Sequence, residues 1–398
     1  MGVAMKDPCE NSAENEPEEE VKAAAGDFSE IAEAEKGSVA DSDSDFETEG
    51  VPGTLGLGEV VKDTLYLGFC QAFNVVPVSC FLRQENAAEL SLRHRGLGPQ
   101  GAQALASMLT SNPYIKRLDL RDNGLCVAGA EALADVLSKN SSISDVDLSE
   151  NQFGAPGVQA LCAALTVNQA VQKMKLAGNG LEEQAAKYLA DLLLVHTGLK
   201  SLDLSYNQLN DQAGETLGPA LAENTGLTEL DISWNHLRGP GAIAFARGLE
   251  ANIFLKVLDI SYNGFGDLGA LAVAEALKVN NVLEELNMSN NRIFAAGALS
   301  LGMDLRVNQT LRILVVSRNP MQSEGCFGLL KSVQDNTASA LELLDISDIE
   351  VNRKFDDLAS SVKVILPGLC IKKGAQREWH IKELLPVFRQ YPQGSAPK

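Results

Sequence analysis

The sequence has no pattern that would hold a metal ion or a phosphate group. Its four histidines, His94, His196, His236 and His380, are widely separated and have no metal-ligand spacing to a cysteine or carboxylate. Neither the phosphate-binding pattern GxxxxGKS/T nor the nucleophile pattern GxSxG occurs. We therefore predict no catalytic residue, no metal site and no cofactor, and we expect a protein that is not an enzyme.

Paired cysteines and long apolar runs are also missing. The seven cysteines are odd in number and form no CxxC pair, which is typical of free thiols in a reducing compartment. No run approaches 18 apolar residues, and the first 20 residues hold seven acidic residues and no apolar core of a signal peptide. These absences predict a cytoplasmic protein that is not held in a membrane.

Positive charge is scarce, particularly at the start of the chain. The net charge of the 398 residues is −20, and residues 1–50 hold 16 acidic residues against three lysines, a net of −13. A negative protein repels phosphate backbones, so we expect no nucleic-acid partner. Residues 1–58 have too few apolar side chains to offset their ordering entropy, and we interpret them as a disordered acidic leader and linker.

Two serines in the leader match the acceptor pattern of an acid-directed kinase. Ser42 and Ser44 lie in the segment DSDSDFE, and each has an acidic residue three positions later. Phosphorylation is one interpretation of this segment. A solvated run of charge is the other.

The centre of the chain repeats every 28 residues. Residues 227–235, LTELDISWN, fit the pattern Leu-x-x-Leu-x-Leu-x-x-Asn. The apolar residue in its fourth position recurs at Leu90, Leu118, Val146, Met174, Leu202, Leu230, Leu258, Leu286 and Leu314. Apolar residues alternate with period two here, which predicts a strand, and about 13 residues later the period becomes helical. The prediction is an α/β leucine-rich repeat solenoid, with parallel strands on its concave face and helices on its convex face.

One position near each helix start stays small. The column reads Gly101, Gly129, Gly157, Ala185, Ala213, Gly241, Gly269, Gly297 and Gly325. Glycine weakens a helix by up to about 1 kcal/mol relative to alanine. Its recurrence predicts that the helix starts pack too closely for a larger side chain.

An asparagine follows almost every predicted strand. The column is Asn123, Asn151, Asn179, Asn207, Asn235, Asn263, Asn291 and Asn319. An asparagine side chain satisfies backbone groups left unpaired where a strand turns away. We predict a structural role for this column.

Both ends of the repeat array depart from the pattern, as terminal caps do. Arg95 replaces the asparagine in the first repeat, and the step from Leu314 to Leu344 is 30 residues. We assign residues 59–87 to an N-terminal cap, residues 88–351 to the repeats and residues 352–398 to a C-terminal cap and tail.

The period and motif resemble the ribonuclease-inhibitor class of leucine-rich repeats. Residues 66–83, YLGFCQAFNVVPVSCFLR, with residues 89–106, ELSLRHRGLGPQGAQALA, more narrowly resemble the leucine-rich repeat-containing protein 74 family. That resemblance implies an intracellular repeat protein with no established chemistry. The ribonuclease-inhibitor resemblance keeps enzyme inhibition as an alternative. GTPase activation is a second alternative, because the Ran GTPase-activating protein has similar repeats, although its acidic segment is C-terminal.

Side chains between the core leucines point to the concave face. Three successive repeats place Asp203, Asp231 and Asp259 there, on strands about 4.8 Å apart. At that spacing neighbouring carboxylates repel by about 1 kcal/mol even in water. The row is either a charged binding surface or a set of local hydrogen-bond acceptors for the serines two residues later.

The residue before the asparagine is aromatic in the same three repeats. Tyr206, Trp234 and Tyr262 either shield the turn or form a contact hot spot. With the three aspartates they predict a binding site for a protein partner that presents a basic surface. We predict an intracellular scaffold that binds its partner through the concave face, and we expect it to be a monomer.

Overall fold

The computed structural model describes residues 57–82 and 87–374. The acidic leader with Ser42 and Ser44 lies outside the described residues, as does the tail from residue 375.

Within the described residues, eleven parallel strands form one sheet, hydrogen-bonded in chain order from β1 to β11. Their bounds are β1 Glu89–Ser91, β2 Arg117–Asp119, β3 Asp145–Asp147, β4 Lys173–Lys175, β5 Ser201–Asp203, β6 Glu229–Asp231, β7 Val257–Asp259, β8 Glu285–Asn287, β9 Ile313–Val315, β10 Leu343–Asp345 and β11 Cys370–Lys372. The central residue of β1 to β9 is the apolar fourth position of the repeat, and Leu344 occupies it in β10. The predicted register is therefore confirmed, and the step of 30 residues is absorbed between β9 and β10.

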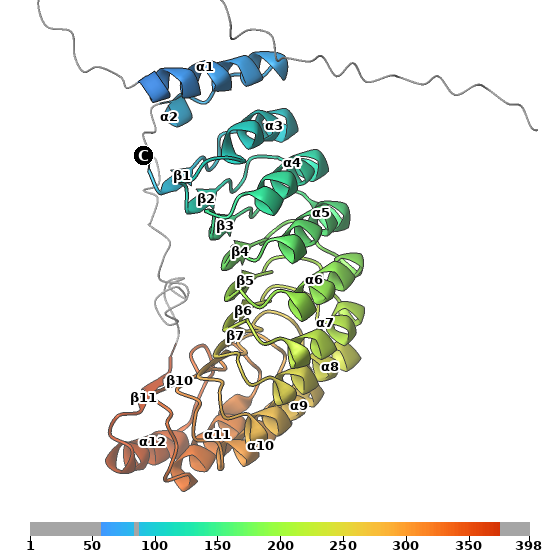
Figure 1. The fold of residues 1–398 in the computed structure, drawn as a ribbon. Coiled ribbons are helices and arrows are strands. Elements are labelled where there is room, and N and C mark those ends of the chain that lie inside the picture. Colours follow the sequence, from blue (N-terminus) through green and yellow to red (C-terminus); the bar gives the residue numbers. More distant parts are fainter. Residues whose placement is uncertain (1–56, 83–86, 375–398) are drawn as a thin grey trace, which may run out of the picture. The chain divides into compact units, whose positions relative to one another are not determined.

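A helix follows each of the first ten strands. Their bounds are α3 Gly98–Leu109, α4 Cys126–Lys139, α5 Gly154–Val167, α6 Glu183–Val195, α7 Asp211–Glu223, α8 Gly239–Ala251, α9 Gly266–Val279, α10 Ala295–Leu305, α11 Gln322–Asp335 and α12 Arg353–Ile365. Figure 1 shows these helices along the outer side of a curved array and the strands along its inner side. The predicted leucine-rich repeat solenoid is confirmed.

The core lies between the strand layer and the helix layer. Leu202 and Leu204 from the strand side are buried, and so are Leu217 and Leu221 of α7. Burying one such side chain contributes about 1.5–3 kcal/mol. Each repeat buries its leucines partly against its neighbours, which makes the stability of the array depend on stacking.

The small column near the helix starts packs as closely as predicted. A Cβ atom on Gly157 of α5 would lie 3.1 Å from the Cβ of Ala130 in α4, which is closer than most real contacts. Between α7 and α8 the backbones themselves meet. There a Cβ on Gly241 would lie 2.3 Å from the carbonyl oxygen of Asp211, and one on Gly248 would lie 2.2 Å from that of Gly218.

Non-repeating elements cover both ends of the array. Helix α1 (Leu57–Ala72) begins two residues before the boundary expected for the cap, a difference within the usual uncertainty of helix ends. The rings of Tyr66 in α1 and Phe81 in α2 (Ser79–Leu82) pack edge to face at 4.5 Å between centroids. At the other end, β11 pairs with β10. No helix in the described ranges has the combined length and apolar character needed to cross a membrane.

Candidate functional site

The asparagine side chains of the column are buried. Each donates hydrogen bonds to backbone carbonyl oxygens and accepts them from backbone N–H groups. The Nδ2 atom of Asn207 donates to the carbonyl oxygens of Leu176 at 3.1 Å and Leu204 at 2.9 Å. Its Oδ1 atom accepts from the backbone N–H groups of Asn179 at 2.9 Å and Leu181 at 3.1 Å. The Nδ2 contacts recur from Asn123 to Asn319, each joining its own turn to the preceding repeat.

The residue before each asparagine has a left-handed backbone, and so do His94 and Asp348, the equivalent residues of the two end repeats. The positive φ angles occur at His94, Asp122, Glu150, Gly178, Tyr206, Trp234, Tyr262, Asn290, Arg318 and Asp348. This conformation suits glycine and asparagine and costs other residues roughly 1–2 kcal/mol. Tyr206, Trp234 and Tyr262 have φ values of 55°, 53° and 53°. Three bulky aromatic residues therefore stand at strained positions, which is a pattern found at functional sites.

These three aromatic rings form a continuous stack. The centroids of Tyr206 and Trp234 are 5.1 Å apart with the ring planes at 11°, and those of Trp234 and Tyr262 are 3.8 Å apart at 9°. Both faces of Trp234 are therefore covered by its neighbours. The accessible part of Trp234 is therefore its edge.

The two ends of the aromatic stack differ. At the Tyr262 end, the guanidinium of Arg318 donates a hydrogen bond to the Tyr262 hydroxyl and another, 2.8 Å long, to Asp348. At the other end Tyr206 is 60% exposed, and the equivalent residue of the preceding repeat is Gly178, which has no side chain. The outer face of Tyr206 is thus the open face of the stack.

The aspartate row lies three residues before the rings, at the ends of β5, β6 and β7. Asp203, Asp231 and Asp259 are paired in register, so their carboxylates are neighbours. Each Oδ1 atom accepts a hydrogen bond from the backbone N–H group of the serine two residues later, at 2.8–3.0 Å. Asp259 also accepts from Nδ2 of Asn287 at 2.8 Å and is 5% exposed, whereas Asp203 and Asp231 are half-buried. The local hydrogen bonds and the row of charge coexist.

Burial raises the pKa of all three carboxyl groups. The pKa of Asp231 rises well above its usual value because of burial and then because of the charges of Asp203 and Asp259. Burial raises the pKa of Asp259 to about 6 against its hydrogen bonds to Ser261 and Asn287. For Asp203 the rise caused by burial is opposed by its bonds to Ser205 and by the charge of Lys175. The raised pKa values mean that the row holds its protons more tightly than free carboxyl groups do, because negative charges side by side and away from water are costly.

Positive side chains balance the acidic residues toward the N-terminal end of the same face. Arg93 bonds Asp119 and lies 3.7 Å from Asp147. Arg121 pairs with Glu150. Beside the aromatic stack, Lys175 is the positive charge that acts on Asp203.

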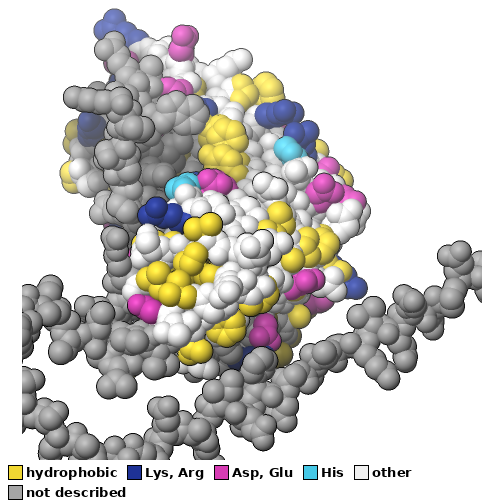
Figure 2. All heavy atoms as spheres, turned by 90° about the horizontal axis from the view of Figure 1, so that it is seen from above, with side chains coloured by type: hydrophobic (Ala, Val, Ile, Leu, Met, Phe, Trp, Pro, Cys, Tyr) yellow, Lys and Arg dark blue, Asp and Glu magenta, His cyan; other side chains and the backbone are white. Residues whose placement is uncertain are grey.

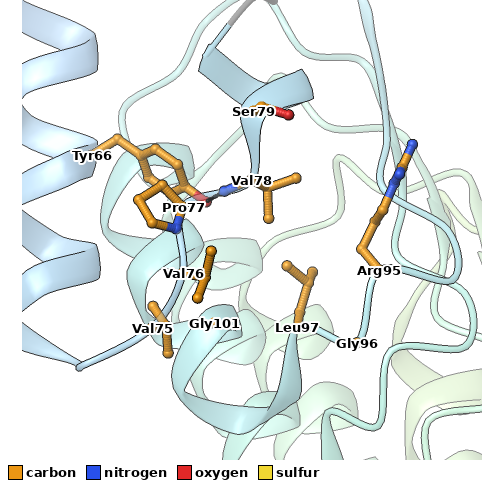
Figure 3. Close-up of a pocket in the computed structure, with 10 residues that line it drawn as sticks. All are labelled: Tyr66, Val75, Val76, Pro77, Val78, Ser79, Arg95, Gly96, Leu97 and Gly101. Carbon is orange, nitrogen blue, oxygen red and sulfur yellow. Dashed lines mark hydrogen bonds between the residues drawn. The ribbon is translucent and has the colours of Figure 1, made fainter.

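A hollow lies between the N-terminal cap and the first repeat, away from the aromatic stack, and has a volume of about 360 Å³. Figure 3 shows Tyr66 and Pro77 on one side, Leu97 opposite them and Arg95 at the rim. Its lining includes Val76, which is 88% exposed, so the hollow is shallow. Figure 2, which looks onto the end of the molecule that carries α1, shows hydrophobic side chains grouped among charged ones. The hollow has fewer converging polar groups than the concave face.

No group of three or more metal-binding side chains is found within residues 57–82 and 87–374. His196 is buried at the end of α6, and its Nδ1 atom accepts from the backbone N–H of Leu199 at 3.0 Å. Asparagines perform the same task at the ends of other helices, as Asn224 does for Leu227.

The sequence placed the aromatic and acidic residues on one surface, and the structure brings them together over β5, β6 and β7. The sequence analysis did not identify Arg318, which contacts Tyr262 from two repeats away. It also did not identify Gly178 as the residue that leaves the outer face of Tyr206 open. A signal for the glycine was available, because Gly178 directly precedes Tyr206 in the column that comes before the asparagines.

A comparison with family models agrees with this architecture. A family model described as Leucine Rich repeat matches residues 111–134, 139–162, 196–218, 223–246, 251–274, 279–302 and 307–330. An internalin of Listeria monocytogenes is a structural neighbour with a TM-score of 0.41 and 12% identity, covering 78% of this chain and 88% of that one. The repeated strand, asparagine turn and helix define a leucine-rich repeat protein.

Curated relatives narrow the class further. The human leucine-rich repeat-containing protein 74B is 83% identical over 395 residues, which cover 99% of this chain and 100% of the human protein. Its mouse counterpart is 68% identical over 113 residues, 28% of each chain. The chain belongs to the leucine-rich repeat-containing protein 74B family.

Proposed function

We propose that this protein is a scaffold that binds a protein partner through its concave face, at a site made of the aromatic stack and the aspartate row. The observation that carries the proposal is the placement of Tyr206, Trp234 and Tyr262 at left-handed backbone positions. Folding alone favours glycine or asparagine there. A bound partner gives the three aromatic side chains a use that offsets this strain.

The chemistry of the partner follows from the charge beside the stack. Asp203 and Asp231 are half-buried carboxylates that repel one another, and a basic side chain relieves that repulsion. The ring edges and the open face of Tyr206 supply apolar contact for the stem of such a side chain. A protein segment that presents lysine or arginine therefore fits this surface.

Two variants test the site on a partner recovered by affinity purification and then purified. Trp234→Ala removes the centre of the stack, and we expect it to weaken binding by about 2 kcal/mol, which is roughly 30-fold. Asp231→Lys reverses the charge, and we expect it mainly to slow association, more strongly at low salt. Affinity and association rate are measured by surface plasmon resonance at two salt concentrations.

Tyr114→Ala is the matched control, because Tyr114 is an aromatic residue 50% exposed that lies outside the stack. Its affinity for the partner should equal that of the wild type. Wild-type affinity in both Trp234→Ala and Asp231→Lys, with folding intact, would show that the partner binds elsewhere. An increase in GTP hydrolysis by a GTPase among the recovered proteins would instead favour an activating role.

A further inference from the structure

The aromatic stack is closed at one end and open at the other. Arg318 of the chain itself bonds the hydroxyl of Tyr262 and is fixed by Asp348. Tyr206, at the opposite end, is the most exposed residue of the stack. The stack therefore has one vacant position next to Tyr206.

Gly178 is responsible for that vacancy. Its φ of 67° matches the left-handed backbone of Tyr206, and its N–H donates to Ser205 as the N–H of Tyr206 donates to Ser233. The two residues are thus equivalent members of successive repeats. Because glycine has no side chain, the space that a fourth ring would occupy is not filled by residue 178.

We refer to the space over Gly178 and next to Tyr206 as the slot. Glu150 borders the slot on the side opposite Tyr206. A Cβ atom on Gly178 would lie 3.0 Å from the Cγ atom of Glu150, so the Glu150 side chain borders the vacant position. Glu150 and Tyr206 are two repeats apart, which is about 10 Å at the usual strand spacing. Because Glu150 reaches toward Gly178 within that interval, the remaining gap suits a planar group stacked on Tyr206.

Charged groups around the slot favour a cation. Asp203 lies at its base on β5, and Asp231 lies on the next strand. Glu150 is bonded to Arg121 at the rim. Lys175 at the end of β4 is the opposing positive charge, and it lowers the pKa of Asp203. Because a neighbouring positive charge favours the ionised form of a carboxyl group, a cation in the slot stabilises the charged forms of Asp203 and Asp231.

We propose that the slot over Gly178, between Tyr206 and Glu150, binds the guanidinium group of an arginine side chain of the protein partner. This inference rests on the proposed function and specifies which side chain the partner presents. A guanidinium is planar and weakly hydrated, so it stacks on an aromatic face while donating to carboxylates at its edge. The ammonium group of lysine carries the same charge but cannot stack as a plane.

The test compares two fluorescent peptides of equal length and charge. Several arginines separated by glycine and serine form the first, and lysine replaces each arginine in the second. Fluorescence anisotropy measures their dissociation constants with the full chain. We expect the arginine peptide to bind about tenfold more tightly than the lysine peptide. Equal affinity for the two peptides would overturn the inference.

Gly178→Tyr fills the slot with a side chain that the next three repeats already show to be compatible with this backbone. We expect this variant to bind the arginine peptide about tenfold more weakly than the wild type does. Gly178→Asn is the control, because Asn290 occupies the equivalent position with a φ of 50° and a short side chain leaves most of the slot open. Unchanged binding of the arginine peptide to a folded Gly178→Tyr variant would also overturn the inference.

A second pair of variants covers the case in which Gly178→Tyr does not fold. Tyr206→Leu removes the flat platform, whereas Tyr206→Phe keeps it. We expect the preference for arginine to disappear in the leucine variant and to persist in the phenylalanine variant. If both peptides bind with equal affinity and Asp231→Lys abolishes the binding of both, the proposed arginine slot is wrong. That result would still support the concave face as the binding surface. If neither peptide binds, the slot is likewise wrong, and the purified partner still tests the face.

Discussion

The asparagine column and the column immediately before it occupy adjacent positions of the same turn, yet they are used differently. The asparagine is present in eight successive repeats, is buried and bonds the backbone wherever it occurs. The preceding residue shares one backbone conformation but varies from charged to aromatic to asparagine. A feature required by stacking recurs in every repeat between the two end repeats. A feature confined to three repeats, and placed against the local backbone preference, calls for a reason outside folding.

The largest effect that separates the two columns is expected for Asn207→Leu. This change removes a side chain that donates to Leu176 and Leu204 and accepts from Asn179. The buried backbone groups lose their partners, and we expect the free energy of unfolding to fall by about 3 kcal/mol. Urea titration followed by circular dichroism measures the change. An unchanged midpoint and slope would contradict the structural role of the column.

An intermediate effect is expected for Asp231→Asn. The raised pKa means that the folded protein holds this proton more tightly than the unfolded chain does. Wild-type stability contributed by this group is therefore present at low pH and is lost as pH rises from about 4 through the raised pKa. Asparagine is already accommodated at the equivalent position 287, where its Oδ1 atom accepts from the Ser289 N–H. We expect the variant to be more stable than the wild type at pH 8 by about 1 kcal/mol.

The extra stability of the Asp231→Asn variant should become smaller as the pH falls toward 4, because the wild-type carboxyl group is then protonated. Thermal unfolding at a series of pH values measures it. Asp357→Asn, on the exposed side of α12, is the control and should show no such pH-dependent gain. A variant less stable than the wild type at pH 8 would mean that the carboxylates do not oppose folding.

The smallest effect is expected for Tyr206→Asn, at the position immediately before Asn207. The variant loses one ring contact, worth roughly 0.5–1.5 kcal/mol, and gains a residue suited to a left-handed backbone, worth roughly 1–2 kcal/mol. We therefore expect stability within about 1 kcal/mol of the wild type. A loss as large as that of Asn207→Leu would make the aromatic stack a folding element and would remove the contrast between the columns.

Most of the fold follows from periodicity, and most of the site geometry does not. The 28-residue spacing located every strand from Leu90 to Leu314, because each repeat needs the same apolar contacts to stack. The same spacing placed Tyr206, Trp234 and Tyr262 on one surface. It did not show that the covered faces of Trp234 exclude a stacked cation, nor that Arg318 closes the stack. Those facts depend on side-chain orientation and on contacts between distant repeats.

The glycine contact between α7 and α8 affects the local curvature of the array. Neighbouring strands are held about 4.8 Å apart by hydrogen bonds, whereas helices usually lie 8–10 Å apart, and the difference produces the bend. Where Gly218 meets Gly248 and Gly241 meets Asp211, the two helices have no side chains to separate them. We therefore expect the difference in spacing to be smaller behind β5 and β6, and the array to bend less there. In that case the repeats that carry Tyr206 and Trp234 would present a flatter surface, against which an extended segment of a partner can lie straight.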